Sequence, residues 1–134
     1  MKEVKTELSK NEVREFRRKI KEQYGSFYNQ ITEIFNRHDP IDLIKIGAPS
    51  DEYGYEISRI LSKLKNTESV LETRRIIYEE FNQSFNYGYS ASNLSKRIKI
   101  GDDFAGTETD YHLIAEEVWA VWETFKLRKA KEKD

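Results

Sequence analysis

The chain has 134 residues, of which 37% are hydrophobic and 35% charged, with a formal net charge of −1. This length suits one domain with a substantial core and disfavours global disorder. The absence of Cys excludes disulfide scaffolds, thiolate zinc sites, iron–sulfur clusters and Cys nucleophiles. There is no signal-peptide stretch and no apolar run long enough to span a bilayer, so we expect a cytoplasmic protein without a membrane partner.

The amino-terminal part has helical spacing. Apolar residues recur at steps of three and four over residues 13–35, which predicts one long helix or two in line. Ser9 or Asn11 is expected to cap its start. Gly25 is the natural place for a break, because glycine is costly inside a helix, and Ser26 can then cap a second helix.

An Asp-Pro pair at 39–40 predicts another helix start, because the Asp side chain can accept a backbone N–H and Pro suits the first turn. A short helical turn over residues 41–44 should follow. The Gly-Ala-Pro stretch at 47–49 should end that turn, and Ser50 or Asp51 is then expected to cap the next helix.

Two amphipathic helices are predicted in the middle of the chain, over residues 53–64 and 70–86, separated by a turn at 66–67. The apolar face of the first consists of Tyr53, Ile57, Ile60, Leu61 and Leu64. Residues 82–95 carry no charge and have the Asn, Ser, Tyr and Gly composition of a loop, not of a strand. A brief helical turn can fit at 94–100.

An acidic loop is expected at 101–106, and Thr107 with Asp110 three residues later resembles a capping box. The last helix places one apolar face along Tyr111, Ile114, Val118, Val121, Trp122 and Phe125. Trp119 lies off that face, where either the amino-terminal helix or an interface would cover it. No sheet is expected. The chain is therefore predicted to be one all-α domain, 1–134, a bundle of four to five helices with an irregular acidic loop before the last helix.

Charge is segregated along the chain, with basic ends and an acidic middle. Four cations at helical spacing form a basic stripe within residues 14–21: Arg14, Arg17, Arg18 and Lys21. A stripe of this kind could meet phosphates, so a nucleic-acid-associated regulatory protein is the alternative function. The acidic remainder of the chain and the lack of a recognisable binding module make nucleic acid an unlikely partner.

The sequence contains no recognisable catalytic constellation. The only histidines are His38 and His112, and neither belongs to a Ser–His–Asp arrangement. Asp110 and His112 are two residues apart, whereas a chelating pair on a helix is normally three or four apart. EF-hand, GxGxxG and GxxxxGK[ST] patterns are missing. We therefore assign no catalytic residue, metal or cofactor and expect a non-enzymatic protein.

The most specific stretch is DPIDLIKIGAPSDEY at 39–53, followed by Glu56 and Ile57. It resembles the DPxxL…GAPxDEYxxEI motif of the YugE-like family of small uncharacterised bacterial helical proteins, over a core of 27–100. Segments 1–26 and 101–134 look like helical additions. The resemblance implies an all-helical fold, and similar small proteins look like immunity partners encoded beside bacterial toxins.

The motif also has a purely physical interpretation. Tyr53 should pack while its hydroxyl finds a polar partner. Glu52 and Glu56 lie one helical turn apart, which is unfavourable unless a cation of this chain or of a partner protein faces them. Glycine and tyrosine at 54 and 55 stand where stronger helix formers would fit.

The leading hypothesis is a protein-interaction module, an immunity protein that neutralises a bacterial toxin by occluding it. If the toxin were a nuclease, its basic cleft would attract the acidic loop, and an uncharged tyrosine-containing loop would supply adaptable contact area. The predicted partner-binding residues are Asp51, Glu52, Glu56, Tyr87, Tyr89, Asp102, Asp103, Glu108 and Asp110.

Overall fold

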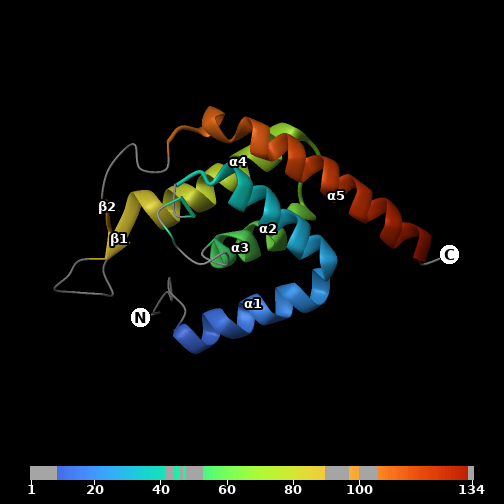
Figure 1. Ribbon diagram of the computed structural model, residues 1–134, viewed down its shortest axis with the longest axis horizontal. Coiled ribbons are helices and arrows are strands. Elements are labelled where there is room, and N and C mark those ends of the chain that lie inside the picture. Colours follow the sequence, from blue (N-terminus) through green and yellow to red (C-terminus); the bar gives the residue numbers. More distant parts are fainter. Residues whose placement is uncertain are drawn as a thin grey trace, which may run out of the picture.

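The computed structural model describes residues 9–41, 44, 45, 47, 53–89, 97–99 and 106–132, with the backbone alone for 85–89 and 97–99. The described residues form five α-helices, packed as a small bundle as predicted, with a short two-stranded ribbon at one end (Figure 1). The elements in chain order are α1 (Lys10–Tyr24), α2 (Ser26–His38), α3 (Gly54–Leu64), α4 (Val70–Phe81), the π-helical turn η1 (Asn82–Asn86), β1 (Tyr87–Tyr89), β2 (Arg97–Lys99), the 3-10 turn η2 (Glu108–Tyr111) and α5 (His112–Glu132). Among the described helices, none combines the length and apolar character needed to cross a membrane.

The predicted break at Gly25 is a corner, so α1 and α2 are two helices that are not in line (Figure 1). Ser9 begins α1 with a reciprocal capping box, in which its hydroxyl and the Glu12 carboxylate each accept the other residue's N–H. Gly25 adopts a φ of 57°, which glycine reaches without steric cost. The prediction that Ser26 caps α2 is wrong, because Gly25 is itself the cap residue and Ser26 is the first helical residue.

Asp39 ends a helix and does not begin one. It is the C-cap of α2, in the left-handed conformation at φ 49° and ψ 58°. Its carboxylate accepts the N–H groups of Ile44 at 3.0 Å and Lys45 at 2.8 Å. The same oxygen that binds Ile44 also accepts the Tyr53 hydroxyl at 2.7 Å. The Asp-Pro pair that was predicted to start a helix therefore follows the end of one, and the Asp39 carboxylate joins the two ends of the connection between α2 and α3. We call the hydrogen bonds of Asp39 with Ile44, Lys45 and Tyr53 the Asp39 staple.

The next helix, α3, begins at Gly54, with Tyr53 at its N-cap and no side-chain cap hydrogen bond. The predicted caps, Ser50 and Asp51, lie outside the described residues. The hydrogen bond from Tyr53 to Asp39 ties the first end of α3 to the last residue of the preceding helix. Tertiary contacts commonly override the local signals that sequence reasoning uses at helix ends.

The core is rich in aromatic rings, and the two segments that looked like helical additions contribute to it. Phe27 of α2 stacks on Phe125 of α5 with ring centroids 4.7 Å apart, and Tyr24 of α1 lies 5.5 Å from the same Phe125 ring. At the other end of α2, Phe35 stacks on Phe81 of α4 at 5.5 Å. Helix α2 therefore runs through the middle of one continuous core that includes α1 and α5.

The segment after α4 differs from its prediction. Strands β1 and β2 pair antiparallel, with residue 87 opposite 99 and 89 opposite 97, where a loop and a brief helical turn were expected. Three-residue strands are too short to show an alternating pattern, which explains why the sequence did not reveal them.

The predicted capping box at Thr107 and Asp110 is confirmed, at the start of the η2 turn that leads into α5. Helix α5 packs against α2 and α4, whereas α1 packs against α3 and α2. The carboxyl-terminal end of α5 projects beyond the other helices (Figure 1), and all described residues from 126 to 132 are exposed. Trp119 is partly buried against the core, with the Lys126 Nζ 5.2 Å from its ring centroid.

Candidate interaction surface on helix α5

The predicted partner-binding residues fall into three groups. Four of them lie outside the described residues: Asp51, Glu52, Asp102 and Asp103. Tyr87 and Tyr89 are the ends of β1, where the structure describes the backbone alone. Glu56, Glu108 and Asp110 are described with their side chains, and each of these three carboxylates contacts other parts of the fold.

Glu108 and Asp110 both hold the start of α5. The Glu108 carboxylate lies 3.2 Å from the Arg74 Nε of α4 and is one-third exposed. Asp110 accepts the Thr107 N–H at 2.8 Å and completes the capping box. These two residues remain at the surface, but their carboxylates already have partners inside the chain. Glu108 anchors the start of α5 to α4, and Asp110 closes the turn that leads into α5.

Glu56 is buried, with 7% of its surface exposed, so its assignment to a partner-binding surface is wrong. Burial raises the pKa of its carboxyl group, and Glu80 acts in the same direction. A hydrogen bond with the Ser84 side chain of η1 and the positive charge of Arg17 act in the opposite direction. The cation that faces Glu56 therefore comes from α1 of this chain.

Arg17 reaches that position because residue 54 is glycine. Its guanidinium lies directly against Gly54 of α3, and a Cβ added there would meet the Arg17 Cζ at 2.5 Å. Real Cβ atoms are not found so close to another heavy atom, so any larger residue would displace the guanidinium. This close approach explains a glycine at the start of a helix, a feature for which the sequence offered no reason.

A second buried carboxylate joins α3 to α4. Glu80 is 4% exposed, and its two oxygens receive hydrogen bonds from Arg59, at 2.7 Å, and from Lys63. Both cations are about two-fifths exposed, so water still reaches them. Buried charges persist when they are paired and hydrogen-bonded, as here. Within the described part of the chain, no three His, Asp or Glu side chains are grouped so that they could hold a metal ion.

Both histidines contact charged side chains where α5 meets its neighbours. The His38 Nε2, at the end of α2, lies 2.6 Å from the Glu117 carboxylate, which also pairs with Arg37 at 2.7 Å. Hydrogen bonds from these two side chains lower the pKa of Glu117 to about 2. His112 lies between Arg74, at 3.3 Å, and Glu116, at 3.2 Å. These contacts fasten the first half of α5 to α2 and α4.

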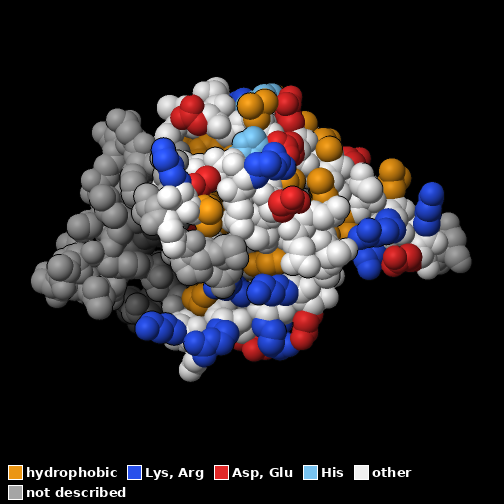
Figure 2. All heavy atoms as spheres, viewed as in Figure 1, with side chains coloured by type: hydrophobic (Ala, Val, Ile, Leu, Met, Phe, Trp, Pro, Cys, Tyr) orange, Lys and Arg blue, Asp and Glu red, His pale blue; other side chains and the backbone are white. Residues whose placement is uncertain are grey.

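The outward face of α5 carries large exposed apolar side chains among its charged ones. Leu113 and Leu127 are 65% and 66% exposed, and the exposed Ala120 lies midway between them. Spacing of seven residues keeps three side chains close to one line on a helix. We call Leu113, Ala120 and Leu127 the outer stripe. Figure 2 shows hydrophobic side chains recurring over α5 on the face in view.

The opposite face of the same helix is already buried in the core, through Ile114, Ala115, Val118, Trp122 and Phe125. Helix α5 therefore has apolar residues on two faces, only one of which is covered within this chain. A helix that is apolar on more than one side is normally packed on more than one side. The arrangement is suited to binding another macromolecule.

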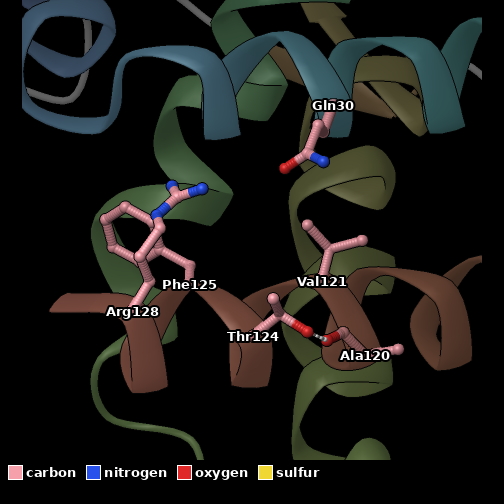
Figure 3. A pocket seen from close by; sticks show the side chains of 6 residues that line it. All are labelled: Gln30, Ala120, Val121, Thr124, Phe125 and Arg128. Atoms are coloured by element: carbon pink, nitrogen blue, oxygen red, sulfur yellow. Dashed lines mark hydrogen bonds between the residues drawn. The ribbon is translucent and has the colours of Figure 1, made fainter. Parts of the chain in front are cut away.

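A pocket of about 210 Å³ adjoins the outer stripe, between α2 and α5. Figure 3 shows Gln30 of α2 pointing across it toward α5, where Val121 and Phe125 supply apolar walls and Arg128 closes one end. Ala120 and Thr124 complete its lining. The pocket extends the apolar surface sideways from the middle of the stripe.

Charge changes sign along this surface. The first part, from η2 into α5, carries four carboxylates and no Lys or Arg: Glu108, Asp110, Glu116 and Glu117. The projecting end carries one carboxylate, Glu132, and four cations, which are Lys126, Arg128, Lys129 and Lys131. Figure 2 shows the basic side chains gathered over that end. We call these two sets the acidic arm and the basic arm.

Sequence reasoning missed the outer stripe, because it assigned apolar residues of the last helix to a single core face. A signal was present, since Leu113, Ala120 and Leu127 follow a seven-residue spacing off that face. Seven-residue apolar spacing is the pattern of helices that pair with other helices.

No family model matches the chain, and neither a curated protein nor a solved structure matches it. The resemblance of residues 39–57 to the YugE-like family stays a prediction.

Proposed function

We propose that the protein is a non-enzymatic interaction module that binds a partner protein through the outer stripe of α5. The observation that carries this proposal is the pair of exposed leucines on a helix whose other face is already buried. Covering the exposed two-thirds of each leucine would contribute roughly 1–2 kcal/mol. The partner surface that fits is a helix with its own apolar stripe, with basic residues facing the acidic arm and acidic residues facing the basic arm.

The cellular role we propose is that of a cytoplasmic immunity protein, which neutralises a bacterial toxin by occlusion. The acidic arm supports this role, because carboxylates at one end of a binding face favour a partner with a basic region. Occlusion needs a fixed face and no reactive group. The ionic contacts of Glu108 and Glu117 with α4 and α2 keep that half of α5 in place.

The alternative function, nucleic-acid binding through the basic stripe, is less well supported. Arg17 lies against Gly54 of α3, and its charge faces the buried Glu56. Arg18 pairs on α1 itself with Glu15 and Glu22. Two of the four cations are thus occupied within the fold. Binding to a labelled DNA duplex at low salt that disappears on Arg14→Glu would favour this alternative over the proposed function.

A photo-crosslinking amino acid placed at residue 127 tests the proposed function in cells. We expect one discrete adduct from residue 127, and its loss when Leu113→Glu is introduced on the same stripe. The matched control places the crosslinker at residue 75, an exposed position on α4 away from the stripe. No adduct from residue 127, or an equal adduct from residue 75, would refute docking on α5.

A further inference from the structure

The outer stripe is symmetric about its centre. Leu113 and Leu127 each lie seven residues from Ala120, which is about 10 Å along the helix axis at 1.5 Å per residue. Two copies of α5 paired antiparallel and centred on Ala120 would therefore bring Leu113 of each copy level with Leu127 of the other. Two Leu113–Leu127 contacts would then form, with each copy contributing the same surface, as a two-fold interface requires.

The residue at the centre of the stripe suits this arrangement. Ala120 would face Ala120 of the second copy on the two-fold axis, where a small side chain allows two helices to approach closely. The pocket lined by Val121, Phe125 and Arg128 lies next to this point, so the second copy would cover it as well. The contact would extend beyond the two leucine pairs.

Charge selects the antiparallel orientation. Antiparallel pairing brings Lys131 of the second copy level with residue 109, between Glu108 and Asp110, and it brings Lys126 within two residues of the level of Glu116. Glu117 comes level with Glu123, so one like-charge pair stands against these opposite-charge contacts. Each contact occurs twice. Parallel pairing would place like charges together along the whole length. Complementary charges steer association and fix orientation, whereas like charges oppose it. The side chains concerned are accessible, with Glu116 54% and Lys129 49% exposed.

We propose that, when no other protein is bound, a second copy of this chain covers the outer stripe, joined antiparallel through α5 about a two-fold axis at Ala120. This inference rests on the proposed function, because it uses the same surface. It adds the occupant of that surface in the absence of a toxin, with its orientation and register. The projecting end of α5 supports it, since that end lies clear of its own bundle and can reach over another (Figure 1).

Sedimentation measurements from about 1 µM to about 1 mM test the association itself. The wild-type mass should rise with concentration from that of the monomer to twice that value. Leu127→Glu should weaken the dimer by about 100-fold, because the substitution removes two symmetric contacts at once. The matched control is Leu71→Glu, which changes a leucine that is 58% exposed on α4, outside the stripe, and should leave the dimer intact.

Cysteine substitutions test orientation and register, and the chain contains no natural Cys to interfere. Ala120→Cys should form a disulfide dimer on mild oxidation. Leu113→Cys and Leu127→Cys should form one only when mixed with each other. A disulfide from Leu113→Cys alone would show parallel pairing and refute the proposed geometry.

A wild-type chain that stays monomeric throughout would overturn the self-association. The photo-crosslinking experiment separates this failure from failure of the proposed function. An adduct of residue 127 with a different protein, together with a monomeric chain, would refute self-association and leave docking on α5 standing. A monomeric chain that also forms no adduct from residue 127 would refute both self-association and docking on α5.

Discussion

Replacing Tyr53 by Phe tests whether the Asp39 staple holds the connection between α2 and α3. Tyr53 is 1% exposed, and its hydroxyl donates to the Asp39 carboxylate at 2.7 Å. The same hydroxyl oxygen accepts the N–H of Ile41 at 3.1 Å. The substitution removes one oxygen atom and leaves the ring, so it isolates these two hydrogen bonds.

The expected loss is about 3 kcal/mol of unfolding free energy. A hydrogen bond to a charged group contributes about 1.5–3 kcal/mol, and a buried donor left without a partner costs about 1–3 kcal/mol. The lower part of the summed range applies, because Asp39 is only partly buried and water can replace part of the lost bond. A loss of this size would lower the melting temperature of such a domain by roughly 10 °C.

Urea unfolding of Tyr53→Phe and Tyr24→Phe gives the matched comparison. The Tyr24 hydroxyl is also buried, but it makes one bond, to the uncharged Leu61 carbonyl at 3.2 Å, and its removal should cost about 1 kcal/mol. Equal losses for the two variants, at unchanged dependence on urea, would refute the staple.

Three further substitutions test the buried and bridging carboxylates. Glu80→Ala should cost about 2 kcal/mol in urea unfolding, below the usual cost of breaking a buried pair, because water reaches Arg59 and Lys63; a loss under about 0.5 kcal/mol would contradict this. Glu56→Gln should raise stability at pH 7 and change it little below pH 4.5, because burial raises the pKa of Glu56 and an ionised carboxylate there opposes folding; the reverse pH dependence would show that Arg17 outweighs burial. Glu117, whose pKa is lowered to about 2 from 4.5, stabilises the fold above pH 4.5 and loses that contribution as pH falls toward 2. Thermal unfolding of the wild type and Glu117→Gln should therefore differ at pH 6 and converge near pH 2, and a constant difference would contradict the assignment.

The helices themselves could be predicted because their signal is local. Apolar spacing identified the core faces of α3 and α5, and the capping box at Thr107 and Asp110 lies where it was expected. Helix ends were less predictable. Asp39 is a residue type typical of a helix start, yet its carboxylate accepts a hydrogen bond from Tyr53, fourteen residues later. Local sequence patterns do not reveal a contact between residues so far apart.

The candidate site was harder to predict than the fold. Glu56 and Arg17 both resembled surface charges, since a charged residue in a sequence is most often exposed. Only the packing of α1 on α3, across Gly54, brings the two together and buries Glu56. The outer stripe is the opposite case, in which apolar residues outside the predicted core face remain exposed.

The sequence by itself determined the helical class, the course of each helix and the apolar face that each one buries, because these properties follow from the 3.6-residue period of the backbone. The tertiary structure alone decided which charges are internal and which apolar residues are left outside. That outcome depends on pairings between helices distant along the chain. Helix α5 has apolar residues on two faces, and only the position of α2 and α4 decides which face is covered and which is left for a partner.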